Sequence, residues 1–117
     1  MKVIPKCWYL YTVDLEPRIG TKPGKQRPCL VIQPTEFVEG GLKSTVILPL
    51  TSKIISGDTF PLRVRIPKGV AGLASPSDIL IDQILAWDNN LFRQELGLLP
   101  EHIIEEVKIA LKDFLDL

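Results

Sequence analysis

Proline and glycine are spread along most of the chain. The 117 residues include ten prolines and eight glycines. Proline removes a backbone donor and glycine favours turns, so the sequence predicts many short elements joined by tight turns. A chain of this length buries roughly two-thirds of the surface that its unfolded form exposes. Because 45% of the residues are hydrophobic, we expect a true core and a single domain spanning residues 1–117.

Several short apolar segments have the composition of β-strands. Their β-branched and aromatic residues predict strands over residues 7–13, 28–33, 44–50, 60–66 and 79–87. Proline donates no ladder hydrogen bond, so Pro28 fits only as the first residue of its strand, and Pro49 predicts an edge strand or a bulge. Arg63 and Arg65 alternate with apolar residues, which predicts a strand with one buried face.

The clearest helix lies near the C-terminal end of the sequence. Pro100 suits a first helical position, and the glutamates after it favour a helix amino end. We predict a helix over 100–113, preceded by a short turn that Asp88 caps and Gly97 ends. Its expected buried stripe contains Ile103, Val107, Ala110, Leu111 and Phe114. Short strands followed by one helix predict a mainly β (α+β) fold: a small antiparallel β-barrel with a C-terminal α-helix.

Positive and negative charges fall in different halves of the sequence. The net charge is zero, which provides no long-range attraction to nucleic acid. Residues 1–68 nevertheless contain 11 Lys and Arg against 5 Asp and Glu, whereas residues 69–117 contain 3 against 9. This asymmetry indicates either a basic face for nucleic acid, or ordinary surface charges that pair when the chain folds back. The sequence leaves both interpretations open.

Cysteine and histidine content argues against disulfide or metal chemistry. Cys7 and Cys29 lie in apolar runs and are expected to be buried thiols. A single histidine, His102, excludes a histidine-rich metal cluster, so we expect no metal and no other cofactor. No signal peptide is visible, and no apolar run approaches the roughly 20 residues of a membrane span. We therefore predict a cytoplasmic protein without membrane contact.

Two of the predicted strands border groups that are able to hold an anion. Arg27 precedes the strand 28–33, behind a loop rich in Gly, Pro and positive charge, and Thr51 and Ser52 follow the strand 44–50. A guanidinium grips a phosphate through two parallel hydrogen bonds, and it would stabilise charge that develops there. The structural alternatives are a solvated Arg27 at a strand edge and two hydroxyls that cap a turn.

Asp82 and Gln83 interrupt the longest apolar run. A carboxylate in such a strand is costly unless it is paired or hydrogen-bonded. Asp82 is therefore a candidate for a functional group, or else a structural partner of a buried arginine. No Gly-x-Ser-x-Gly motif of a hydrolase triad occurs, and His102 lies on the predicted helix. Any phosphoryl chemistry would depend on Arg, Lys, Thr or Ser, and Asp.

Five motifs, taken in order, resemble the MazF/PemK/Kid family of toxin ribonucleases. They are Asp-Leu-x-Pro at 14–17, Arg-Pro with an apolar strand at 27–32 after Gly20, Pro-Leu-Thr-Ser at 49–52, Asp-Gln at 82–83 and Leu-Gly-x-Leu at 96–99. The resemblance covers nearly the whole chain. It implies a small SH3-like barrel, usually a homodimer, that cleaves single-stranded RNA without metal. It also implies an antitoxin whose peptide occupies the RNA groove.

The resemblance assigns roles to individual residues. Arg27 and Thr51 fall on the main catalytic positions, and Asp82 falls where some members have a proposed catalytic aspartate. The chain departs from the family at Lys22, where the usual residue is glutamate, and at Leu80, where some members have arginine. These departures leave lower activity, altered RNA choice or loss of catalysis as open outcomes. The expected RNA-binding residues are Lys22, Lys25, Ser52, Lys53 and Gln83.

The leading interpretation is the toxin of a type II toxin–antitoxin system. It would cleave single-stranded RNA at selected sequences and leave 2′,3′-cyclic phosphate and 5′-hydroxyl ends. The expected partners are single-stranded RNA, a cognate antitoxin and a second copy of the chain, with DNA bound only indirectly through a toxin–antitoxin complex. Two alternatives stand beside it: a catalytically weak or inactive module that binds RNA or a peptide in the same groove, and a DNA gyrase poison of the same fold.

Overall fold

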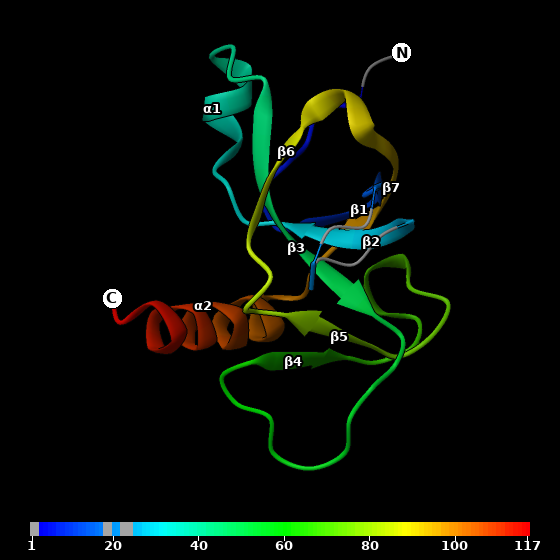
Figure 1. Cartoon of the computed structure of the whole chain (residues 1–117), viewed down its shortest axis with the longest axis vertical. Coiled ribbons are helices and arrows are strands. Elements are labelled where there is room, and N and C mark those ends of the chain that lie inside the picture. The colour runs from blue at the N-terminus through cyan, green and yellow to red at the C-terminus, as the bar shows by residue number, and fades with distance from the viewer. Residues whose placement is uncertain (1–2, 18–19, 22–24) are drawn as a thin grey trace.

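A computed structural model describes residues 3–17, 20–21 and 25–117. Antiparallel strands dominate it, and a long helix follows the last strand (Figure 1). The strands assigned within these ranges are β1 Tyr9–Asp14, β2 Gln26–Val31, β3 Ser44–Thr51, β4 Arg63–Ile66, β5 Ser77–Leu80, β6 Leu85–Asp88 and β7 Phe92–Leu98. The helices are α1 Thr35–Glu39 and α2 Glu101–Leu115, with short 3-10 turns η1 Val70–Gly72 and η2 Asn89–Leu91.

The strands form one sheet in the order β4-β5-β3-β2-β1-β7. Strand β3 is its centre: β2 lies on one side, while β6 and β5 share the other. Strand β6 pairs with Ser44–Ile47, and β5 pairs with Leu50 and Thr51. The sheet is not closed, since β4 and β7 end the order of paired strands in the described part of the chain. The predicted mainly β (α+β) fold with a C-terminal helix is confirmed.

The central strands are buried on both faces. Leu10, Leu30 and Leu48 pack into a core that α2, β4 and β5 cover. Their sequence neighbours face the other way, into a second cluster that contains Tyr11 and Phe92, whose rings meet edge to face at 5.8 Å. Strands buried on both faces read as continuous apolar runs rather than as alternating patterns. This explains why the segments 28–33 and 44–50 carry few polar residues.

Two prolines mark the place where β2 and β3 separate. Pro28 is the third residue of β2, not the first as predicted, and it pairs with Thr12 of β1. Strand β3 pairs with β2 only from Cys29 onward, so Pro28 has a strand on one side, which a residue without an N–H tolerates. Pro49 lies in the central strand rather than at an edge, at a gap between the segments of β3 that pair with β6 and with β5.

Other strands differ from their predicted extents. The predicted strand 60–66 begins only at Arg63, and the predicted strand 79–87 is two strands, β5 and β6, joined by a turn. Asp88 does cap the turn η2, accepting a hydrogen bond from the amide of Asn90 at 2.8 Å. Gly97 does not end that turn, because it lies inside β7. Most of β7 is exposed, and an exposed edge strand has no apolar alternation by which to recognise it.

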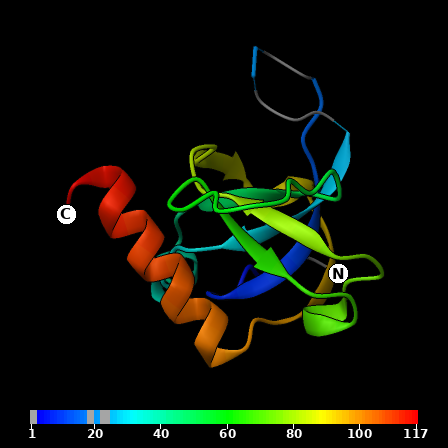
Figure 2. The same cartoon turned by 90° about the horizontal axis from the view of Figure 1, so that it is seen from below.

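Helix α2 packs along one side of the sheet, against β4 (Figure 2). Pro100 precedes it as the N-cap residue. Ile103, Val107 and Ala110 of the predicted stripe are buried, as is Ile104, but Phe114 is 40% exposed near the end of the helix. No helix in the described ranges is long and apolar enough to cross a membrane.

Two glycines bring the turn η1 against β7. Gly72 has a φ of +78°, and a Cβ there would lie 2.3 Å from the carbonyl oxygen of Leu96. A Cβ on Gly97 would lie 2.9 Å from the carbonyl carbon of Ala71. Backbone atoms cannot yield as flexible side chains do, so this approach requires glycine on both sides. Leu73 follows this contact directly in the chain.

Replacing Gly72 with alanine should therefore destabilise the fold more than the same change at Gly69. Both glycines have positive φ, +78° and +83°, but Gly69 has open space where a Cβ would stand. Gly69→Ala should cost about 1–2 kcal/mol from backbone conformation alone. Gly72→Ala should cost roughly 1–3 kcal/mol more because of the added clash. Urea unfolding measures both, and equal losses would show that the close approach to β7 is not rigid.

Candidate functional site

A cleft opens where β2 and β3 part. Cys29 and Pro49 form the last recorded pair between the two strands. Continued by two residues, the same register would set Arg27 opposite Thr51. The strands diverge instead, and the cleft between them has a volume of about 280 Å³. Its lining comes from the start of β2, the end of β3 and the segment before β5: Lys25, Gln26, Arg27, Pro28, Leu50, Thr51, Ser52, Leu73, Ala74, Ser75 and Ser77.

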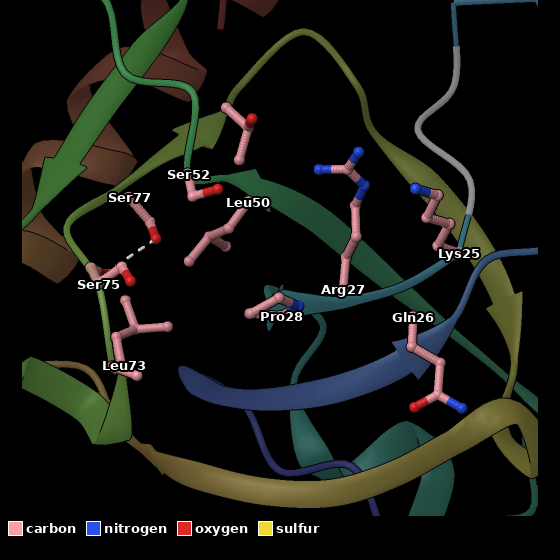
Figure 3. Close-up of a pocket in the computed structure, with 11 residues that line it drawn as sticks. Lys25, Gln26, Arg27, Pro28, Leu50, Ser52, Leu73, Ser75 and Ser77 are labelled. Carbon is pink, nitrogen blue, oxygen red and sulfur yellow. Dashed lines mark hydrogen bonds between the residues drawn. The ribbon is translucent and has the colours of Figure 1, made fainter.

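One wall of the cleft is basic. The side chains of Lys25 and Arg27 point to the same side of the chain, whereas that of Gln26 points away (Figure 3). Lys25 is exposed and Arg27 is half-buried. The backbone of Lys25 is tied to the segment after β1: its amide donates to the Glu16 carboxylate, and its carbonyl accepts from the amide of Leu15 at 2.9 Å. The segment after β1 thus holds the backbone of Lys25 in place.

Four hydroxyls line the cleft, from Thr51, Ser52, Ser75 and Ser77. The three serines lie across from Arg27 (Figure 3). Thr51 is only 9% exposed, and its Oγ1 accepts a hydrogen bond from the amide of Lys53 at 3.1 Å. A hydroxyl has one donor and two acceptor sites, so this bond leaves the proton of Thr51 available to a ligand. Ser77 is buried and donates to the carbonyl of Ser75 at 3.2 Å.

This arrangement suits an anion with some apolar surface. Charged donors face neutral hydroxyl donors across the cleft, while Pro28, Leu50 and Leu73 supply apolar lining between them. Phosphate oxygens accept hydrogen bonds from both kinds of donor. Among the described residues that line the cleft, none has a carboxylate, imidazole or thiol. Cys29 is adjacent in sequence but buried, which raises the pKa of its thiol, so it stays protonated at neutral pH.

The structure brings together only part of the predicted site. Arg27, Thr51, Ser52 and Lys25 share the cleft. Lys53 is exposed just beyond it and contributes its backbone amide to Thr51. The remaining predicted residues are placed elsewhere: Asp82 is exposed in the turn between β5 and β6, Gln83 is half-buried after that turn, and Lys22 lies outside the described residues.

A buried carboxylate paired with arginine does exist, but it is Asp78 and not Asp82. Asp78 is 1% exposed and opens β5 with Ser77. Its oxygens accept from Arg65 at 2.5 Å and from Arg63 at 3.1 Å. Burial alone would raise the pKa of Asp78, but the hydrogen bonds from the two arginines outweigh it and lower that pKa. Arg63 and Arg65 alternate with apolar residues along β4, and this pattern was visible in the sequence. The sequence did not show that Asp78 is the carboxylate they share.

The sequence profile of PemK-like, MazF-like toxins of type II toxin–antitoxin systems matches residues 6–115. The chain belongs to this toxin family. The endoribonuclease MazF of Staphylococcus saprophyticus is 31% identical to it over 102 residues, which cover 87% of this chain and 83% of that protein. The endoribonuclease EndoA of Bacillus subtilis is 29% identical over 110 residues, 94% of this chain and 93% of that one.

Solved structures of MazF proteins share the toxin's fold. A crystal structure of MazF from Deinococcus radiodurans superposes with a TM-score of 0.79 at 23% identity, covering 98% of this toxin and 99% of that chain. A MazE–MazF structure from the same organism gives a TM-score of 0.74 at 23% identity, with 98% of each chain covered. The family expected from the five sequence motifs is therefore confirmed, and so is its fold.

Asp78→Asn should make the toxin less stable at neutral pH and less sensitive to acid. The lowered pKa means that the ionised carboxylate stabilises the folded state above its unfolded pKa of about 3.9, and that this contribution is lost as pH falls through the folded pKa. At pH 7 the loss of charged hydrogen bonds should cost about 1–3 kcal/mol. The difference in free energy of unfolding between variant and parent should become smaller below about pH 4. Urea unfolding across this pH range measures it.

Asp82→Asn provides the matched control, because Asp82 is exposed in a turn. That variant should unfold at nearly the parent's urea concentration at neutral pH. A difference between Asp78→Asn and parent that stayed constant down to pH 3 would contradict the role assigned to the ionised Asp78.

Proposed function

We propose that this toxin is an endoribonuclease that cleaves single-stranded RNA, at selected sequences and without a metal ion. The observation that carries the proposal is the position of Arg27 and Thr51 on opposite walls of one cleft, where β2 and β3 part. The relatives named endoribonuclease, which match nearly the whole chain, support the same activity.

The proposed reaction is an attack by the RNA itself. The 2′-hydroxyl oxygen bonds to the adjacent phosphorus while the bond to the 5′-oxygen of the next nucleotide breaks. The 2′-hydroxyl loses its proton and the departing 5′-oxygen gains one, so the products are a 2′,3′-cyclic phosphate and a 5′-hydroxyl. Negative charge on the phosphate oxygens grows in the transition state, and Arg27 and Thr51 would stabilise it as preorganised donors. The described residues of the cleft lining include no carboxylate or imidazole that could act as a general base.

The flanking residues would bind the rest of the RNA. Lys25 and Ser52 line the cleft and Lys53 is exposed beside it, so they can contact neighbouring phosphates. Contacts of this kind set affinity and make it depend on salt. A role for Lys22 and for Asp82 or Gln83 in binding or catalysis stays a prediction, since the first is not described and the other two do not line the cleft.

We further propose an antitoxin partner, a homodimer and a cytoplasmic site of action. The family is defined by toxin–antitoxin pairs, and related MazF chains are solved in MazE–MazF structures. Exposed apolar side chains, among them Phe60, Leu62 and Ile109, provide surface for protein contacts. Light scattering at micromolar concentration should give twice the chain mass of 13.1 kDa; a monomer that still cleaves RNA would exclude the dimer as a requirement.

The proposed activity predicts RNA cleavage in excess chelator. Single-stranded RNA incubated with the toxin should yield fragments with 2′,3′-cyclic phosphate and 5′-hydroxyl ends, detected by phosphatase and kinase treatment of the products. Fragments with 5′-phosphate ends, or a strict need for added metal, would contradict the mechanism. RNA that is bound and left intact would instead identify a binding module. Inhibition of DNA gyrase without RNA cleavage would identify a gyrase poison.

Arg27→Ala should lower the rate of cleavage by roughly 10²–10³, the usual effect of losing one transition-state donor. Arg93→Ala is the matched control: it removes the same charge outside the cleft, where Arg93 pairs with Asp14 at 3.5 Å. Single-turnover cleavage at saturating toxin separates this effect from weaker RNA binding. A folded Arg27→Ala toxin that cleaves at the rate of Arg93→Ala would remove Arg27 from the site.

A further inference from the structure

The candidate catalytic hydroxyl is connected to the buried Asp78 through two intervening residues, Lys53 and Arg63. Arg63 Nη1 donates to an oxygen of Asp78 at 3.1 Å and to the carbonyl oxygen of Lys53 at 3.0 Å. The amide of the same Lys53 donates to Thr51 Oγ1 at 3.1 Å. Both backbone polar groups of Lys53 are thus bound, its carbonyl by Arg63 and its amide by the hydroxyl of Thr51, a residue that lines the cleft.

A second arm of this network leads elsewhere. Arg65 Nε donates to the other oxygen of Asp78 at 2.5 Å, and Arg65 Nη2 donates to the carbonyl of Ile55 at 2.8 Å. The amide of Ile55 also donates to Asp78, at 3.3 Å. This arm holds the loop between β3 and β4 further along the chain and makes no recorded bond to Lys53 or Thr51. Arg63 and Arg65 therefore share one anchor but hold different residues.

The burial of these groups makes Asp78 the fixed point. Its side chain is 2% exposed, against 21% for Arg63 and 44% for Arg65. The segment that they hold is exposed from Ser52 through Asp58, so packing does little to fix it. A buried carboxylate bonded to three donors has few alternative arrangements. Each arginine also donates to a backbone carbonyl of the exposed loop, so the loop is held to a carboxylate that is itself fixed.

We propose that Arg63, oriented by Asp78, is a positioning residue for Thr51. The inference rests on the proposed RNA cleavage. Thr51 lines the cleft, and its Oγ1 accepts from the amide of Lys53, so the hydroxyl can still donate its own proton to a ligand. When Arg63 holds the carbonyl of Lys53, that amide stays in place and the hydroxyl keeps its direction. Without Arg63, the exposed segment moves and Thr51 loses its orientation, although every residue that lines the cleft is still present.

Arg63→Met and Arg65→Met form a matched pair to test this. Each removes one of the two arginines from Asp78 and keeps an unbranched apolar stem, so each should lower stability. Only Arg63→Met releases Lys53. Single-turnover cleavage should fall by about 10- to 100-fold in Arg63→Met, the scale expected when a reacting group is misplaced, with little change in affinity for uncleavable RNA. The fall in Arg65→Met should be less than about tenfold.

A double-mutant cycle identifies the residue through which Arg63 acts. If the effect passes through Thr51, adding Arg63→Met to Thr51→Ala should lower the rate no further, because the hydroxyl to be positioned is already gone. If the double variant instead lost activity by the product of the two single factors, the two residues would act independently and the proposal would be overturned. So would a cleavage rate that falls equally in Arg63→Met and Arg65→Met, since a general loss of stability would then explain both.

Hydrogen exchange at the Lys53 amide tests the same point without using activity. That amide should exchange faster in Arg63→Met than in Arg65→Met. The two variants are compared under conditions in which they have the same free energy of global unfolding. Unchanged protection of Lys53 in Arg63→Met overturns the positioning role whatever the protein does to RNA. If Lys53 responds as expected but the parent toxin leaves RNA intact, the proposed ribonuclease function fails while the structural link between Arg63 and Thr51 stands.

Discussion

The architecture depends on how β3 shares its hydrogen bonds among three strands. On one side it pairs with β6 and then with β5, and on the other with β2 as far as Cys29 and Pro49. The amide of Ile32 donates to the carbonyl of Val46, and in this register the next β2 residues to donate toward β3 are Leu30 and then Pro28. Pro28 lacks that N–H, so the pairing stops before it. The resulting fork places the start of β2 and the end of β3 opposite each other without joining them. A single interruption in the ladder thus creates a cleft whose walls are rigid strands.

The sequence was informative where local pattern decides structure. The apolar runs around Leu30 and Leu48 predict buried strands, and the polar residues that border them predict Arg27 and Thr51 as the opposing groups of a site. The missed features depend on pairing between distant segments. The partner of Arg63 and Arg65 is apparent only from the register of β4 and β5, which sets Arg65 opposite Asp78. An apolar run also concealed the turn at Asp82, because Ile81 within that turn is itself buried.

The two interpretations of the charge asymmetry concern different residues. Arg63 and Arg65 in the basic half bind Asp78 in the acidic half, and Lys6 pairs with Glu95 at 3.0 Å on the surface. In these pairs a cation from the basic half meets a carboxylate from the acidic half, as expected when the chain folds back on itself. The exposed pairs add little stability. Lys25 and Arg27 instead line the cleft. Under the proposed function, the positive charge that would contact RNA is therefore local, and the net charge of the chain gives no measure of it.

Asp78 joins the stability of the fold to the geometry of the site. Its lowered pKa keeps it ionised at neutral pH, so the connection through Arg63 and Lys53 to Thr51 stays intact over the range in which RNA would be cleaved. Cys29, with its raised pKa, stays neutral over the same range. Neither group can therefore give a pH dependence near neutrality. The part of the cleft lining that the structure describes has no carboxylate or imidazole, so such a dependence would have to arise from residues other than these. Within the cleft, Arg27 and Thr51 would act by fixed charge and direction rather than by exchanging protons.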